Sequence, residues 1–369
     1  DRKQAAHNIG NTVILFLVLS IALTAILLSL VHPIVVAMST PTDAVSGTVT
    51  YLTICFIGIP FITSYNIISS IFRGLGDSKS PMCFIATACA ANIALDYLFM
   101  GVLHLGPAGA ALGTTLSQAI SVVVSLTVIL KRRSIVLKKS DFKPCRAVMG
   151  KILGIGIPIA FQDGLIQVAF IIITIIANQR GLNDAAAVGI VERVISFLFL
   201  VPSSMLSTVS AFGAQNIGAG KPDRAIQTLR YAVMLAAGFG VLASIAIQFT
   251  AEGIVSLFTD PSTADGAAVV RFGGQYLRGY IFDCIFAGIH FSFSGFFCAC
   301  RKSGLSFLHN ILAIVLMRVP GVYVTSKLFP APLLPMGLAT AAGSLLSVVI
   351  CLIAFGVIRR KSTLVLVEE

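Results

Sequence analysis

Ten long apolar stretches run through the 369 residues of the chain, and they constrain its fold more than any other feature. A helix needs about 20 mostly apolar residues to cross the roughly 30 Å of hydrocarbon in a bilayer. The stretches cover residues 12–32, 50–71, 82–103, 108–130, 149–177, 186–215, 228–249, 279–300, 305–328 and 333–358. They lack the alternation with period two that is typical of strands in an outer-membrane barrel. The sequence therefore predicts an all-α integral membrane protein with ten transmembrane helices.

The distribution of charge indicates how these helices are oriented. Charged residues make up 11% of the chain, whereas a soluble domain has about 25%, so a water-soluble globule is excluded. The net charge is +11, and twenty basic residues lie in one set of alternate loops, while the opposite loops hold only Arg180 and Lys327. Because basic loops stay in the cytoplasm, we predict a multi-pass protein of the cell membrane. The basic residues are dispersed at helix ends, which argues against a nucleic-acid partner.

An internal repeat appears when the chain is shifted by 228 positions, and transporters are often built from duplicated halves. The matching pairs are Arg73–Arg301, Leu105–Leu333, Pro107–Pro335, Gly109–Gly337, Ala111–Ala339 and Arg132–Arg360. Two stretches, 149–177 and 186–215, precede the second copy but have no counterpart before the first. Since two membrane helices with their loops need about 70–80 residues, we expect that many N-terminal residues to be missing.

This organisation predicts two pseudo-symmetric helical lobes that contain ten helices of an inferred twelve. We expect an N-terminal lobe over residues 1–133 that lacks its first two helices, and a basic cytoplasmic linker over 134–148. A C-terminal lobe of six helices follows over 149–361, and residues 362–369 form a cytoplasmic tail.

Four motifs connect the chain to a known family. FGAQNIGAGKPDRA (212–225), IFRGLGDSKSP (71–81), NIALDYLF (92–99) and GPAGAALGTTLSQ (106–118) resemble the multidrug and toxic compound extrusion (MATE) family. The resemblance implies a monomeric antiporter without a cofactor, coupled to protons or sodium. Such a protein exports small organic, often cationic, substrates by alternating access between its lobes, and membrane lipids surround it.

The glycine-rich segment 213–221 does not fit a phosphate-binding loop. Lys221 is followed by Pro222 instead of Ser or Thr, and no strand precedes the segment. Because glycine adopts conformations that other residues avoid, Gly218 and Gly220 are interpreted as part of a tight cytoplasmic turn. Arg73 and Arg301 mark equivalent basic turns with a structural or gating role.

Polar residues interrupt the stretch 149–177 at Gln162, Asp163, Gln167 and Thr174. Offsets of 4 and 11 residues place Gln167 and Thr174 on the same helix face as Asp163. A charge at mid-bilayer costs at least about 2.5–3.5 kcal/mol on insertion scales, so it should face the protein interior or a wet cavity. We interpret this face as the wall of a polar pathway in which Asp163 binds the coupling cation or substrate. Hydrogen bonding between helices is the alternative.

A second polar face lies on the stretch 279–300, where Asp283, His290 and Ser294 are spaced by 7 and 4 residues. A carboxyl group and an imidazole can exchange protons there, and histidine titrates nearest to neutral pH. The resemblance implies that an acidic residue on this helix takes part in cation coupling, without fixing its position. His290 favours protons over sodium. The alternative for Asp283 is an interfacial contact with Arg278.

The remaining charges within the apolar stretches leave their roles open. Glu192 and Arg193 are adjacent and point about 100° apart on a helix, so we expect each to pair with another helix. They either line the cavity or neutralise other charges. Asp96 favours a structural role, and Arg318 requires a carboxylate partner or a cavity.

Two other functions are less consistent with the sequence. A lipid-linked saccharide flippase should present several basic residues to a pyrophosphate, but only Arg193 and Arg318 are candidates inside the membrane. A membrane-embedded enzyme should carry catalytic motifs, and the sequence has neither H-E-x-x-H nor G-x-S-x-G. An antiporter is therefore the favoured function.

Overall fold

The computed structural model describes residues 2–37, 42–132 and 138–360. These residues form helices joined by short turns, and they contain no strand. Ten helical segments in this part of the chain are long and apolar enough to cross a membrane, which confirms the predicted class and number. Residues 134–137 of the predicted linker and the predicted tail, 362–369, lie outside the described residues.

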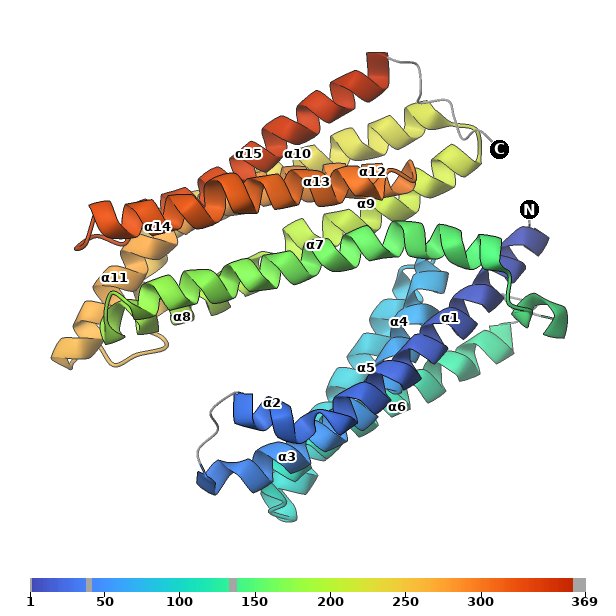
Figure 1. Ribbon diagram of the computed structural model, residues 1–369, viewed down its shortest axis with the longest axis horizontal. Helices are drawn as coiled ribbons and strands as arrows, with labels where there is room; N and C mark the ends of the chain where they lie inside the picture. Colours follow the sequence, from blue (N-terminus) through green and yellow to red (C-terminus); the bar gives the residue numbers. More distant parts are fainter. Residues whose placement is uncertain (1, 38–41, 133–137, 361–369) are drawn as a thin grey trace. The chain divides into compact units, whose positions relative to one another are not determined.

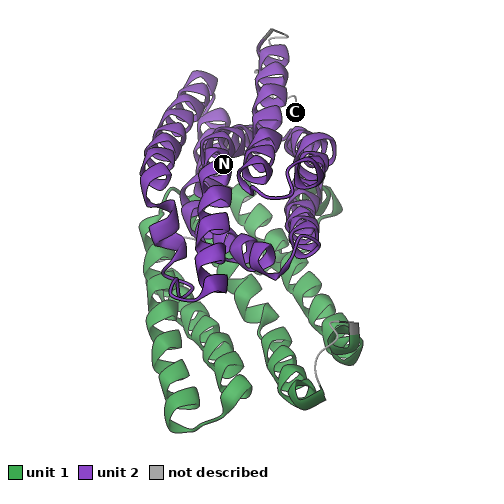
Figure 2. Cartoon of the chain, turned by 90° about the vertical axis from the view of Figure 1, so that its left-hand side faces the viewer, with its two compact units in different colours: residues 1–152 green, residues 153–369 purple. Residues whose placement is uncertain are grey.

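The chain divides into two compact units, residues 1–152 and 153–369, which are called unit 1 and unit 2 below (Figure 2). Unit 1 contains four membrane-length segments, Gln4–Ser29, Thr42–Gly74, Lys79–Val102 and Gly106–Lys131. Its helices are α1 (Arg2–Ser29), α2 (Val31–Ala37), α3 (Thr42–Ile57), α4 (Ile59–Gly74), α5 (Lys79–Asp96) and α6 (Gly106–Arg132), shown in blue to teal in Figure 1. The π-helical turn that extends α5 covers Tyr97–Val102, and a short 3-10 helix covers Lys139–Phe142.

Unit 2 contains the other six membrane-length segments. Its helices are α7 (Arg146–Asn178), which begins just before the unit boundary, α8 (Leu182–Leu198), α9 (Leu200–Gly218), α10 (Pro222–Val255), α11 (Ala264–Tyr280), α12 (Phe282–Ala299), α13 (Ser303–Ala313), α14 (Val319–Leu328) and α15 (Leu334–Arg360). A π-helical turn, Ile314–Arg318, joins α13 to α14 so that together they form one segment.

The helix boundaries follow the repeat found in the sequence. Helices α6 and α15 both contain 27 residues, and their first residues, Gly106 and Leu334, are 228 positions apart. The segments that precede them, α5 with its π-helical turn and α13 with α14, also occupy equivalent places in the chain. The four segments of unit 1 therefore correspond in order to the last four segments of unit 2.

The predicted start of one segment is wrong. The apolar stretch at 279–300 is only the second part of a longer segment, Ala264–Ala299, in which α11 precedes α12. Hydropathy did not predict α11 as part of a membrane segment, because Arg271 and Arg278 lower the mean hydropathy of this helix. Arg278 is neutralised by Glu252 of α10, with Nη1 and Oε1 3.0 Å apart.

This correction moves Asp283 from the end of a segment to its interior. The predicted interfacial contact between Asp283 and Arg278 is therefore wrong, since Arg278 pairs with Glu252. Asp283 is completely buried at the start of α12.

Helix α12 is the central helix of unit 2. In the segment Ala264–Ala299, 72% of the 18-residue apolar stretch is buried, against 6% in the segment formed by α1. Helix α12 packs against α9, α10 and α15. The approach of α9 is close at Gly295, where an added Cβ would lie 2.5 Å from the carbonyl oxygen of Leu206. Small residues at such crossings allow membrane helices to pack backbone to backbone. The polar residues of α12 are therefore placed inside the unit.

We expect Gly295→Ala to lower the free energy of unfolding by about 1–3 kcal/mol, because the new methyl group must push α9 away from α12. Gly253→Ala in α10 is the matched control, because an added Cβ there has no neighbour within 4 Å. Thermal unfolding of the purified variants measures both effects. Equal unfolding temperatures for the two variants would contradict the close packing of α9 on α12.

The interpretation of the glycine-rich segment as a turn is confirmed. Helix α9 ends at Gly218, and Gly220 has a φ of +70°, in the region that glycine adopts most easily. Helix α10 then begins with Pro222 in its first turn, where the missing N–H of proline has no helical partner to lose.

Candidate functional site

A buried ion pair joins Asp283 of α12 to Arg318, the last residue of the π-helical turn. Nη2 of Arg318 donates a hydrogen bond to Oδ2 of Asp283, and another over 3.4 Å to Oγ of Ser344. Nε of Arg318 donates to the carbonyl oxygen of Thr340 over 3.4 Å. The carboxylate requirement predicted for Arg318 is thus met, and both charges are neutralised within unit 2.

The local backbone explains how a guanidinium fits at this position. A π-helical turn contains an additional residue within the helix, and such turns are frequent at functional sites. Helix α15 approaches closely, because a Cβ on Gly343 would lie only 2.7 Å from Cβ of Arg318. Glycine at 343 therefore makes room for the stem of the arginine between the two helices.

Two histidines form a second polar cluster beside the ion pair. Nε2 of His309 lies 2.8 Å from Oγ of Ser294, and Nδ1 of His309 lies 2.5 Å from Oγ of Ser347. The ring centroids of His290 and His309 are 5.6 Å apart. Nδ1 of His290 is buried without a hydrogen-bond partner among the described residues. His290 and Ser294, predicted to share a face, therefore meet around a third residue, His309.

Sequence reasoning missed His309 as a site residue. The pattern that could have identified it is the group Ser306, His309 and Asn310, polar residues within the otherwise apolar α13. In an apolar segment such residues face the interior of the protein, and all three are buried.

A small cavity of about 50 Å³ lies beside Arg318 of the ion pair and His290 of the histidine cluster. Its polar lining consists of His290, Asn310, Arg318, Ser344 and Ser347. A water molecule occupies about 30 Å³ in the liquid, so the cavity has room for one or two waters. This partly open cavity, called the chamber below, thus has hydrogen-bond donors and acceptors in a mainly apolar wall.

Helix α7 places its predicted site residues in different surroundings. Gln162 is completely buried, and its Oε1 accepts a hydrogen bond from Oγ of Ser306 over 2.7 Å. Asp163 and Gln167 are exposed on the surface of unit 2. The amide therefore ties α7 to α13, whereas the carboxylate lies outside this polar cluster.

The next predicted residues lie between α7 and α8. Oγ1 of Thr174 lies 3.4 Å from each carboxylate oxygen of the half-buried Glu192. Arg193, the neighbour of Glu192, is exposed. As expected, the two adjacent residues do not form an ion pair with one another in the part of the chain that the structure describes.

Three further predicted residues lie apart from this cluster. In unit 1, Asp96 of α5 is half-buried beside Gly113 of α6, where an added Cβ would collide with Oδ1 of the carboxylate. Arg73 donates a hydrogen bond from Nη2 to Oγ of Ser70 over 3.0 Å. Arg301 in unit 2 is exposed in a turn with a φ of +57°.

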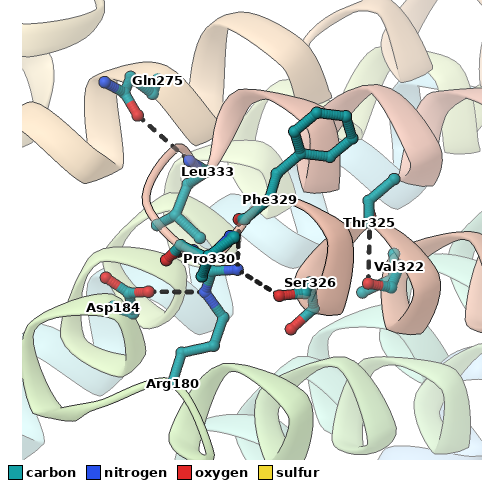
Figure 3. A network of polar contacts seen from close by, with 9 residues as sticks. All are labelled: Arg180, Asp184, Gln275, Val322, Thr325, Ser326, Phe329, Pro330 and Leu333. Atoms are coloured by element: carbon teal, nitrogen blue, oxygen red, sulfur yellow. Dashed lines mark hydrogen bonds and ion pairs between the residues drawn. The ribbon is translucent and has the colours of Figure 1, made fainter.

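Arg180 forms a polar network that the sequence did not indicate (Figure 3). Its Nε donates to Oδ2 of Asp184 over 2.7 Å. Its Nη1 donates to the carbonyl oxygens of Ser326 and Phe329 over 2.9 and 3.0 Å, and Nη2 donates to that of Pro330 over 2.8 Å. The side chain is only 6% exposed. One guanidinium thus joins the turn after α7 to the end of α14.

These features together define a class of protein. A repeated bundle of membrane-length helices, with an ion pair and histidines inside its central segments, is typical of a multi-pass membrane transporter. In the described ranges no group of three His, Cys, Asp or Glu side chains could hold a metal ion.

The comparisons with known proteins identify the family. The MatE family model matches residues 1–98 and 158–324, and the chain belongs to this family. Its members are transporters of the cell membrane and not enzymes.

Two curated relatives and one solved structure show the extent of the similarity. The probable multidrug resistance protein YpnP of Bacillus subtilis (strain 168) is 30% identical over 320 residues, which are 87% of this chain and 71% of that protein. The FAD transporter of Shewanella oneidensis is 27% identical over 282 residues, 73% of this chain and 60% of that protein. The solved structure is the outward-facing conformation of a multidrug resistance MATE family transporter of the MOP superfamily, which matches with a TM-score of 0.90 at 20% sequence identity. The match covers 98% of this chain and 80% of the chain in that structure. The last comparison shows the fold.

Proposed function

We propose that this chain is a cation-coupled antiporter that exports small organic, often cationic, compounds by alternating access. The proposal is supported by the family and by relatives named as a probable multidrug resistance protein and a multidrug export protein. The observation that carries it is the set of ionisable groups inside the central segments of unit 2. A cation that binds two conformations with different affinity shifts their populations, and this coupling drives export.

Three carboxylates of unit 2 supply candidate sites for the cation or the substrate. Asp163 is exposed on α7, Glu192 is half-buried beside Thr174, and Asp283 is paired with Arg318. Of these three, Asp163 is the one that is exposed on the surface of unit 2. The coupling ion is either a proton or a sodium ion, since a carboxylate can bind both.

The flippase alternative loses support from the same geometry. A pyrophosphate would require free basic side chains in the chamber. Arg318 lines the chamber but is already neutralised by Asp283. Arg193 is exposed and does not line it.

We expect Asp163→Asn to reduce cation-driven export at least tenfold, because the amide cannot release a proton or carry the charge that binds a cation. The measurement is efflux of a fluorescent organic cation from liposomes, under proton and sodium gradients applied separately. Asp265→Asn near the start of α11 is the control, since this exposed carboxylate accepts a hydrogen bond from Asn183. Unchanged efflux in Asp163→Asn would remove this residue from the coupling mechanism.

A further inference from the structure

The buried carboxylate of Asp283 already has a cation bound to it, and that cation is part of the chain. An arginine side chain keeps its proton in proteins, so Arg318 carries a full positive charge beside Asp283. Asp283 is completely buried, and a buried charge requires a partner of the opposite sign. Arg318 fulfils this requirement without a free ion.

The oxygens around Arg318 are those that a free metal cation would use. Arg318 donates to a carboxylate oxygen of Asp283, the hydroxyl of Ser344 and the carbonyl of Thr340. Carboxylate, hydroxyl and carbonyl oxygens are the ligands of hard cations in proteins. Since the guanidinium lies among these three oxygens, a sodium ion cannot occupy the same place.

A second observation concerns how firmly the arginine is held. The backbone of Gly343 lies directly against its Cβ, and the π-helical turn places its backbone at this crossing. Asn310, Ser344 and Ser347 line the cavity beside it. The fold therefore positions the guanidinium through its stem, its backbone and its hydrogen bonds.

We propose that Arg318 is a tethered cation that fills the Asp283 site and thereby excludes free sodium from unit 2. Arg318 is thus a residue that determines ion specificity. This inference rests on the proposed cation coupling, and it deepens that proposal by assigning the ion response of unit 2 to its own guanidinium. Its removal should open a site for sodium, lined by Asp283, Thr340 and Ser344.

The test compares wild type with Arg318→Met and Arg318→Lys in the purified protein. Thermal unfolding is measured in sodium chloride and in choline chloride of equal concentration, which separates sodium binding from screening by salt. We expect Arg318→Met to unfold several degrees higher in sodium chloride than in choline chloride. Arg318→Lys should respond like wild type, because lysine also supplies a tethered charge. An Arg318→Met variant with no greater sodium response than wild type would overturn the proposal.

Asp283→Asn/Arg318→Met is the matched control, and the sodium response gained by Arg318→Met should disappear in it. If Arg318→Met does not fold, the neutral pair Asp283→Asn/Arg318→Gln decides the question. If wild type unfolds at a higher temperature in sodium chloride than in choline chloride, this difference should persist in the double variant. Its loss in the double variant would show that Asp283 binds free sodium in wild type and would overturn the proposal. Because these experiments measure ion binding, failure of the antiporter proposal would appear separately, as absent efflux of the organic cation by wild type.

Discussion

Replacement of Asp283 by Leu should lower the free energy of unfolding by about 3–5 kcal/mol, because it leaves Arg318 buried without a counter-charge. The other two acceptors of Arg318, the hydroxyl of Ser344 and the carbonyl of Thr340, are neutral and lie 3.4 Å away. They cannot replace the carboxylate. Thermal or chemical denaturation of the purified variant measures the loss.

The double variant Asp283→Leu/Arg318→Met should recover most of this stability, since two apolar side chains of similar length remove both buried charges together. The matched surface control is Glu252→Gln, which weakens a pair whose carboxylate side chain is 52% exposed. Its effect should be below about 1 kcal/mol. A double variant as unstable as Asp283→Leu alone would show that the pair does not account for the loss.

Hydropathy predicts the ten segments because the membrane requires long apolar helices, and that requirement is local in sequence. It fails at α11, where Arg271 and Arg278 lower the apolar content of a helix that still belongs to a segment. The contact of Arg278 with Glu252 links residues 26 positions apart, on another helix. A local criterion cannot detect such a partner.

The candidate site shows the same limit. Helical spacing correctly placed His290 and Ser294 on one face, but the residue between their side chains, His309, comes from α13. The partner of Asp283 is 35 positions away in the sequence. Spacing predicts which residues share a helix face, but the packing of α12, α13 and α15 decides which of them meet.

The two units repeat their helices but differ in the ionisable side chains that pack against a glycine of the next helix. In unit 1 the acidic Asp96 of α5 packs against Gly113 of the next helix, α6. In unit 2 the basic Arg318, between α13 and α14, packs against Gly343 of the next helix, α15. The contact between an ionisable side chain and a glycine is thus present in both, while the charge differs in sign.

Replacement of Arg180 by Met should lower the free energy of unfolding by about 2–4 kcal/mol, because a single change removes four charge-assisted hydrogen bonds. Three of their acceptors are the carbonyl oxygens of Ser326, Phe329 and Pro330, at the end of α14 and in the turn that follows it. Carbonyl groups at the end of a helix have no partner within the helix, so Arg180 supplies one (Figure 3). Asp184 would also lose its counter-charge. Thermal unfolding measures the total effect, and hydrogen exchange should increase most over residues 326–333.

Arg180→Lys separates the charge from the shape of the side chain. A lysine can still pair with Asp184, but its single ammonium group cannot reach three carbonyl oxygens in the planar arrangement of a guanidinium. We therefore expect a loss of stability between those of wild type and Arg180→Met, with hydrogen exchange over residues 326–333 still elevated. Wild-type exchange in Arg180→Lys would mean that the charge near Asp184 is sufficient and that the contacts to α14 contribute little. The expected result instead assigns Arg180, one of the few basic residues outside the loops predicted to be cytoplasmic, to holding the ends of α7 and α14 together.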